Sequence, residues 1–284
     1  MSTRTRVGVA AVVLALFIAG QVSQSAATPI GGAGQVRYGV SKRMGFDACT
    51  APSASTMQTW WTYSPYWDVG IYIGGVNRAC SQPNLTPSWA SAVHNQGWSY
   101  YLTWVGLQAP CSTLSVSKMS SDAATATSEG RTAADNAVSA ASSLGFTGFN
   151  AYYFDMEAYP TGNAGCKTAV NAFINGWSDE IQNYWGERAG AYGSGCGSSV
   201  DSWAYIGHPP NDVWIADWNL DPDVWGLGCV PNGHWINDQR LHQYRGGHNE
   251  TYNGVTINID NDCADGLVVP HGHDTTGDPA CTTE

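Results

Sequence analysis

Short apolar segments alternate with segments of helical periodicity along most of the 284-residue chain. Apolar runs of this length, rich in β-branched and aromatic residues and bounded by turn-forming residues, are typical of strands. Eight strands are predicted, at residues 44–49, 69–74, 100–105, 152–157, 189–192, 213–218, 241–244 and 256–259.

Helices are predicted between the strands of the first part of the chain. Ser53 is in an N-cap position for a helix over 53–61, and Thr86 followed by Pro87 begins a second helix that continues through Asn95. An Ala-rich helix is predicted over 128–144. The most regular helix, 168–185, has apolar residues at intervals of three to four, at Val170, Phe173, Ile174, Trp177, Ile181 and Trp185.

This alternation predicts an α/β fold, a (β/α)8 TIM-like barrel in a single domain. Helical signals are weak between the last three strands, so the second half of the barrel is expected to have weak helices. An open doubly wound sheet is the alternative that the same pattern allows. We take 44–265 as the barrel, 28–43 as an N-terminal extension and 266–284 as a C-terminal tail.

The first 27 residues have the pattern of a secretion signal peptide. Arg4 and Arg6 precede an apolar run over 7–20, and small residues follow up to a cleavage position near Ala27. An uncleaved anchor is the alternative, and no other segment approaches the length of a membrane span. We therefore predict a protein that is secreted, extracellular or cell-wall associated, with no stable membrane insertion.

The eight cysteines are expected to form four disulfides, because an even number outside the cytoplasm is typical of an oxidised framework. The sequence leaves the pairing open. Most of them follow the predicted strands closely, so the disulfides are expected to brace the loops at the strand ends. They are Cys49, Cys80, Cys111, Cys166, Cys196, Cys229, Cys263 and Cys281.

The composition narrows the class of partner. The formal net charge is −11, and removal of the signal would make it more negative still. A strongly acidic surface repels nucleic acid and anionic lipid. With 13 Trp, 14 Tyr and only 12% charged residues, the chain suits a neutral polymer, and we predict a monomer that binds a polysaccharide or oligosaccharide without a cofactor.

The segment 151–159, AYYFDMEAY, has two acids at its end, Asp155 and Glu157. Residues two apart in a strand point the same way, about 7 Å apart. Burial and mutual repulsion would leave one carboxyl protonated and the other ionised, as cleavage of a glycosidic bond requires. The alternative is a strand end whose acids face solvent or cap the next helix.

Further candidates lie where other predicted strands end, the position of active sites in such barrels. Asp260 is on the last strand, next to the first in a closed barrel, so it would meet Asp47 at the rim. The alternatives are a cap for the helix at Ser53 in the case of Asp47, and a turn in the case of Asp260. Asp217 and Gln243 are further candidates for substrate binding.

Four aromatic residues are candidates for stacking on sugar rings, namely Trp104, Tyr192, Trp218 and Tyr244. Trp218 is the strongest of them because it ends a strand, and packing in the core is the alternative for each. No metal site is predicted. His271 and His273 are in the predicted tail with too few fixed ligands around them, and His242 and His248 have no nucleophile motif beside them.

Several ordered motifs resemble one known family. GFDACTAP, YIGGVNRAC, TWVGLQAPC, YFDMEAY, WIADWN and QYRGGHNETYNGVTINID closely resemble the actinobacterial glycoside-hydrolase-like domain catalogued as domain of unknown function 1906, over about residues 44–265. The resemblance implies a TIM-like barrel. It also implies a more distant similarity to family 25 lysozymes, which cleave the bond between N-acetylmuramic acid and N-acetylglucosamine in peptidoglycan.

Site residues of the lysozymes are implied only where motifs match, at Asp47, Asp155, Glu157, Gln243, Tyr244, Asp260 and Asn261. The lysozymes have a fuller DxExE motif. This chain has Ala158 and Tyr159 at its last two positions. The difference concerns the sugar-binding subsite and therefore the exact substrate.

The sequence thus predicts a secreted glycoside hydrolase acting on peptidoglycan or another N-acetylhexosamine polymer of the cell envelope. Glu157 would be the general acid and base, and Asp155 would stabilise the positive charge that develops on the sugar. Asp47 would raise the pKa of Glu157 or bind a sugar hydroxyl. The alternatives are a catalytically inactive barrel that binds wall glycan and a transglycosidase of wall remodelling.

Overall fold

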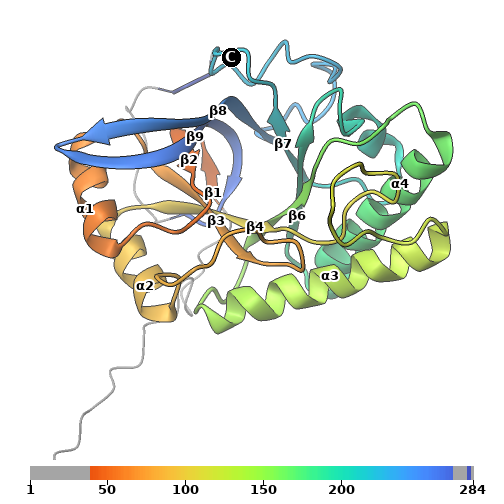
Figure 1. The fold of residues 1–284 in the computed structure, drawn as a ribbon, viewed down its shortest axis with the longest axis horizontal. Coiled ribbons are helices and arrows are strands. Elements are labelled where there is room, and N and C mark those ends of the chain that lie inside the picture. The colour runs from red at the N-terminus through yellow and green to blue at the C-terminus, as the bar shows by residue number, and fades with distance from the viewer. Residues whose placement is uncertain (1–38, 271–279, 283–284) are drawn as a thin grey trace, which may run out of the picture.

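A computed structural model describes residues 39–270 and 280–282 as a closed barrel of eight strands (Figure 1). The barrel strands are β2 (Met44–Asp47), β3 (Asp68–Gly74), β4 (Ser99–Trp104), β5 (Ala151–Met156), β6 (Arg188–Ser194), β7 (Asp212–Ala216), β8 (Arg240–Tyr252) and β9 (Val255–Val268). Each neighbouring pair from β2 to β8 is parallel, and β9 pairs with both β8 and β2. The predicted barrel is confirmed, and the open sheet is excluded because the ring closes.

The last strand differs in direction from a regular (β/α)8 barrel. β9 is antiparallel to both of its neighbours and follows β8 through a tight hairpin turn at Asn253 and Gly254, whose φ angles are 47° and 79°. No crossover helix is needed for such a connection. The hairpin projects beyond the barrel beside α1 (Figure 1), where Trp60 Nε1 donates to the carbonyl of Val255 at 3.1 Å. A short strand β1 (Gly39–Ser41) pairs antiparallel with β9.

The predicted helices are present with small shifts of their ends. They are α1 (Ala54–Tyr63), α2 (Pro87–Gln96), α3 (Ala123–Ser143) and α4 (Ala164–Asp179), the last continued by η1 (Glu180–Tyr184). Ser53 and Thr86 cap α1 and α2 as expected. α3 and α4 begin earlier than predicted, because Asp122 and Asn163 provide the N-caps. Only a 3₁₀ turn, η2 (Val200–Tyr205), lies within the described second half after β6.

Alternation along the strands builds two apolar cores. Outward-facing residues such as Phe46 and Phe154 pack against the helices, where Phe154 meets Phe173 and Trp177 of α4. Inward-facing aromatic side chains fill the barrel interior, where Tyr101, Tyr153 and Trp214 pack together. These side chains therefore fill the interior of the barrel below the carboxyl ends of its strands.

Four disulfides are present, as predicted, and no cysteine of the described chain is free. Three of them, Cys49–Cys80, Cys111–Cys166 and Cys196–Cys229, join segments that follow the carboxyl ends of the strands, and Cys166 lies in the first turn of α4. Such a framework is typical of extracytoplasmic proteins. Within the described residues no helix has the length and apolar character needed to cross a membrane.

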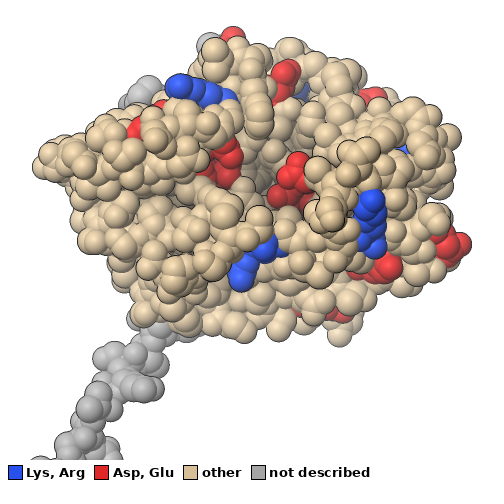
Figure 2. Space-filling model, in the orientation of Figure 1, with Lys and Arg blue, Asp and Glu red and all other residues tan. Residues whose placement is uncertain are grey.

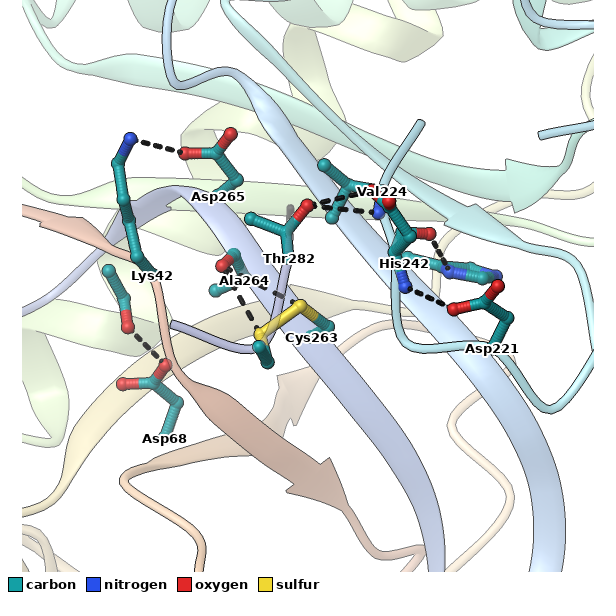
Figure 3. The surroundings of a disulfide bond; sticks show 12 residues. Lys42, Asp68, Asp221, Val224, His242, Cys263, Ala264, Asp265 and Thr282 are labelled. Atoms are coloured by element: carbon teal, nitrogen blue, oxygen red, sulfur yellow. Dashed lines mark hydrogen bonds and ion pairs between the residues drawn. A yellow bond between two sulfur atoms is a disulfide. The ribbon is translucent and has the colours of Figure 1, made fainter. Parts of the chain in front are cut away.

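The fourth disulfide, Cys263–Cys281, ties residues 280–282 to β9 (Figure 3). Thr282 Oγ1 donates to Asp223 Oδ1 at 2.8 Å, and the backbone N–H of Cys281 donates to the carbonyl of Lys42 at 3.1 Å. Part of the segment expected as a tail is thus attached to the barrel. The predicted signal peptide and most of the predicted N-terminal extension lie outside the described residues.

Candidate active site

Asp155 and Glu157, at the end of β5, line a cavity of about 260 Å³ at the carboxyl ends of the strands. Its other walls come from the loops after β2, β3 and β4 and include the Cys49–Cys80 disulfide. Figure 2 shows a hollow on this face of the molecule with acidic side chains on two sides of it. The structure therefore places the predicted acid pair in a concave site rather than on a flat solvated surface.

The two acids of the pair have different surroundings. Asp155 is buried, and its Oδ1 has no hydrogen-bond partner among the described residues, whereas Glu157 is accessible to solvent. Burial raises the pKa of Asp155 well above its ordinary value, and repulsion from Glu157 and Asp47 adds to the rise. Burial and repulsion from Asp260 also raise the pKa of Glu157, which we take as the smaller rise because water reaches this carboxyl.

Gln108 fixes the strand end that carries the pair. Its Nε2 donates to the carbonyl of Asp155, and its Oε1 accepts the backbone N–H of Glu157, both at 2.8 Å. The buried amide thereby satisfies two backbone groups at the end of β5. Gln108 was not predicted as a site residue, although it lies within the TWVGLQAPC motif.

Asp47 is buried and receives two hydrogen bonds. Tyr72 Oη donates to its Oδ1 at 2.6 Å, and Gln243 Nε2 donates to its Oδ2 at 2.8 Å. Burial, followed by repulsion from Asp260, raises the pKa of Asp47 to about 7. Its carboxyl does not cap α1, because Ser53 has that role. Tyr72, an inward-facing residue of β3, is a second site residue that the sequence analysis missed.

A hydrogen-bonded row continues from Asp47 to the rim. Gln243 Oε1 accepts from Tyr192 Oη at 2.9 Å and from Trp218 Nε1 at 3.1 Å. Trp218 is 64% exposed, and its ring lies so close to Gly246 that a side-chain Cβ there would approach it to 2.7 Å. The indole is therefore held at an exposed rim position by one hydrogen bond and one backbone contact, as a stacking platform for a sugar would require.

Asp260 lies opposite Asp47 in the register of β9 and β2, as predicted from barrel closure. Burial raises the pKa of Asp260, while His248 and a hydrogen bond with Asp47 act in the opposite direction. Asn261, the next residue, points to the other side of the strand, where its Nδ2 donates to Tyr66 Oη at 2.5 Å. Asp47 and Asp260 thus form a second acid pair at the mouth of the barrel.

Three predicted substrate-binding residues have other partners. The Asp217 carboxylate accepts the backbone N–H of Gly228 at 3.0 Å. Trp104 faces outward on β4 and lines a different cavity, beside α3. Tyr244 packs with Val224 and Cys263 outside the barrel. The structure does not bring these three side chains to the acid pairs.

His242 holds the segment that follows β7. His242 contacts the carbonyls of Asp217 and Asp223 through its two ring nitrogens, each at 2.7 Å. In residues 39–270 and 280–282, no group of three or more His, Cys, Asp or Glu side chains is arranged to hold a metal ion. His271 and His273 lie outside the described residues.

The barrel with acid pairs at its mouth defines a glycoside hydrolase-like protein. The chain belongs to the family described as the Rv2525c-like, glycoside hydrolase-like domain, whose profile matches residues 58–264. The resemblance noted from the motifs is thereby confirmed. Among curated proteins, no significant sequence match is found.

Solved structures share the fold at low sequence identity. The Tat-secreted protein Rv2525c of Mycobacterium tuberculosis, in complex with L-tartrate, is 14% identical with a TM-score of 0.52, covering 79% of this chain and 96% of its own. The spore cortex lytic enzyme SleM of Clostridium perfringens is 15% identical with a TM-score of 0.51, covering 78% and 67%. A family 25 glycosyl hydrolase from Bacillus anthracis matches at 14% identity and a TM-score of 0.48, covering 81% and 90%.

Proposed function

We propose that this protein is a secreted glycoside hydrolase that cleaves a cell-envelope polysaccharide, either peptidoglycan or another N-acetylhexosamine polymer. The observation that carries the proposal is the pairing of Asp155 with Glu157 in one cavity. Asp155 is buried with an unpaired carboxyl oxygen, and Glu157 beside it is accessible. Most buried polar atoms in proteins have a partner, and a hydrogen-bond donor of a bound sugar would satisfy Asp155 Oδ1.

Glu157 is the proposed general acid and base. Of the two carboxyls it is the more exposed, and its raised pKa favours the protonated form needed to protonate the leaving group. After departure of the leaving group, the Glu157 carboxylate takes a proton from the attacking water. The same residue thus serves both half-reactions.

Asp155 is the proposed stabiliser of positive charge. In the free protein its raised pKa favours a neutral carboxyl. The N–H of a 2-acetamido group would satisfy the unpaired Oδ1 and, as a donor to the charged form, would favour ionisation of Asp155. The ionised carboxylate could then stabilise the charge at the sugar, which is the reason for proposing an N-acetylhexosamine.

Asp47 and Asp260 complete the acid set. Asp47 is buried and held by Tyr72 and Gln243, and we propose that its repulsion keeps the pKa of Asp155 high, as repulsion from Asp260 does for Glu157. Trp218 and Tyr192, joined to Asp47 through Gln243, are proposed to contact the sugar faces. Asp217, Trp104 and Tyr244 are not assigned to the substrate.

The setting supports an envelope substrate. Three disulfides join segments at the carboxyl ends of the strands, and one of them, Cys49–Cys80, lines the cavity, which suits an enzyme working outside the cell. Two proteins of similar fold are described as Tat-secreted and as a spore cortex lytic enzyme. We propose the same extracytoplasmic location for this chain, after removal of the signal peptide.

A glycan-binding barrel without activity is the second candidate, favoured by the residues after the acid pair. Tyr159, at the position of the second glutamate of the lysozyme motif, is buried, and its backbone N–H donates to Gly197. The position therefore contributes no acid to the cavity. A transglycosidase would use the same residues as the hydrolase and differ in the acceptor.

The test is a substrate panel. Purified wall, peptide-free glycan strands, chitin oligosaccharides and α- and β-glucans are incubated with the mature protein, and new reducing ends are measured. Release from N-acetylhexosamine polymers alone is expected. Binding of wall glycan without any new reducing end would favour the binding barrel, and products longer than the substrates would favour the transglycosidase.

A further inference from the structure

One basic side chain shares the cavity with the acid pair. Of the described residues that line it, Arg78 is the only Lys, Arg or His. In a chain with a formal net charge of −11, a cation placed beside Asp155 and Glu157 requires a reason. Neither carboxyl is within ion-pair distance of Arg78 in the described structure, so the guanidinium is not present to neutralise them.

Most of the hydrogen-bond donors of the Arg78 guanidinium are not used within the described residues. Its Nη1 donates to the carbonyl of Tyr72 at 3.2 Å, and this is the one hydrogen bond of its side chain within the described residues. Nε and Nη2 remain, and together they form the flat edge of a guanidinium that binds a carboxylate through two parallel hydrogen bonds. This bond fixes the orientation of the group, because the Tyr72 carbonyl belongs to the backbone of β3.

The turn that carries Arg78 is rigidly built. Gly75 has a φ of 111°, and a Cβ there would collide with the backbone of Val105. The Asn77 amide donates to the carbonyls of Gly106 and Ser117, each at 2.8 Å, and so ties the turn to the loop after β4. Two residues after Arg78, Cys80 forms a disulfide with Cys49. A side chain on such a turn is preorganised for a ligand.

We infer that Arg78 binds a carboxylate carried by the sugar chain, so that the substrate is an acidic glycan rather than a neutral one such as chitin. This inference rests on the proposed function and narrows its substrate class. A carboxylate neutralises the single cation of the cavity. A phosphate would bring a second negative charge close to Asp155 and Glu157, which disfavours it. Val105, Leu114 and Val116 form an apolar wall of the same cavity and suit the uncharged atoms next to the carboxylate.

The experiment compares three glycans of equal length by calorimetry. They are peptide-free wall strands with free lactyl carboxylates, the same strands with these groups converted to methylamides, and chitin oligosaccharides phosphorylated at O6. All measurements use the Glu157→Gln protein, so that no strand is cleaved. The variants Arg78→Gln, Arg78→Lys and Arg131→Gln are made in that background. Arg131 is the matched control, because it pairs with Asp179 on the outer side of α3 and α4.

The free carboxylates are expected to improve the dissociation constant about tenfold over the methylamides, the effect of one charge-assisted hydrogen-bonded pair. Arg78→Gln should abolish this preference, Arg78→Lys should keep part of it, and Arg131→Gln should keep all of it. Thermal unfolding of each variant checks the fold. If Arg78→Gln does not fold, salt tests the inference instead. The preference of the Glu157→Gln protein for the carboxylate strands must then decrease when NaCl is raised from about 0.02 M to about 0.5 M.

Equal binding of carboxylate and methylamide strands would overturn the inference while leaving the proposed function intact. Tighter binding of the phosphorylated chitin oligosaccharides would also overturn it. If the Glu157→Gln protein binds none of the three glycans and the unchanged protein cleaves none of them, both the inference and the proposed function fail.

Discussion

The side-chain amide of Gln243 donates to Oδ2 of Asp47 at 2.8 Å across the last strands to close the barrel, although the two residues are 196 positions apart. Gln243 also accepts hydrogen bonds from Tyr192 and Trp218. One amide thus connects a buried acid of the site with an exposed aromatic ring at its rim. The mouth of the barrel is therefore a single hydrogen-bonded unit, and changes at one member are expected to reach the others.

Gln243→Leu is expected to lower both stability and glycan binding. It removes one donor to Asp47 and one acceptor for Trp218, and leaves buried polar groups unpaired, at a cost of about 1–3 kcal/mol in the free energy of unfolding. Urea unfolding measures this cost. Gln182→Leu is the control, since Gln182 is bonded to Pro209 outside the site. If Gln243→Leu binds glycan as tightly as the parent protein, the row does not position Trp218.

Trp218→Ala should weaken glycan binding with little effect on stability. The ring is already 64% exposed, so its removal should change the free energy of unfolding by less than about 0.5 kcal/mol. Loss of an aromatic platform should raise the dissociation constant about tenfold, which corresponds to about 1.4 kcal/mol. Tyr184→Ala, at a 72% exposed ring on η1, should change neither quantity. Unchanged binding by Trp218→Ala would remove this residue from the site.

Asp68→Asn is expected to gain stability relative to the parent protein as pH rises. Burial raises the pKa of Asp68 to about 7 from its ordinary value of 3.8. The folded state therefore holds this proton more tightly than the unfolded state. The stabilisation that comes from this protonated carboxyl is complete below about pH 4. It is lost as the pH rises towards about 7, by about 1.4 kcal/mol per pH unit. Urea unfolding at about pH 4.5, 6 and 7.5 measures the difference between the two proteins, and a difference independent of pH would contradict the assignment.

Removal of the Cys49–Cys80 disulfide should affect both stability and the cavity. In the chain-entropy account, replacing both cysteines by Ala costs about 3–4 kcal/mol, and it frees the turn that carries Arg78. Removal of Cys263–Cys281 should cost about as much stability without changing glycan binding, because that bond lies on β9 away from the cavity. Equal effects of the two removals on binding would show that the first disulfide has no role in the site.

Much of the barrel could be predicted because strand period and helix caps are local signals. The predicted barrel implied a parallel last strand, and this prediction was wrong for a local reason as well. Asn253–Gly254 is a strong hairpin signal, and it lies between two strands that were predicted with a longer separation, since the polar outer ends of β8 and β9 lack an apolar run. The meeting of Asp47 with Asp260 was still predicted, because closure alone makes the first and last strands neighbours.

The site was predicted less completely. Gln243 and Tyr244 are adjacent, and successive strand residues face opposite sides, so only Gln243 could join Asp47. Trp104 faces outward for the same reason. Gln108 and Tyr72 were missed because their roles depend on contacts between different strands and loops. A glutamine that bonds to the backbone of a strand 47 positions away leaves no periodic signal.

The most direct measurement of the central claim is the rate at which reducing ends form on purified wall, compared among the parent protein, Glu157→Gln and Glu180→Gln. Glu180 is on η1, outside the cavity, and its variant controls for the loss of a carboxyl. The account predicts that Glu157→Gln lowers the rate by about 10²–10⁴-fold with glycan binding retained, and that Glu180→Gln leaves it unchanged. Equal rates for Glu157→Gln and the parent protein, or no reducing ends from a parent protein that binds the wall, would contradict it.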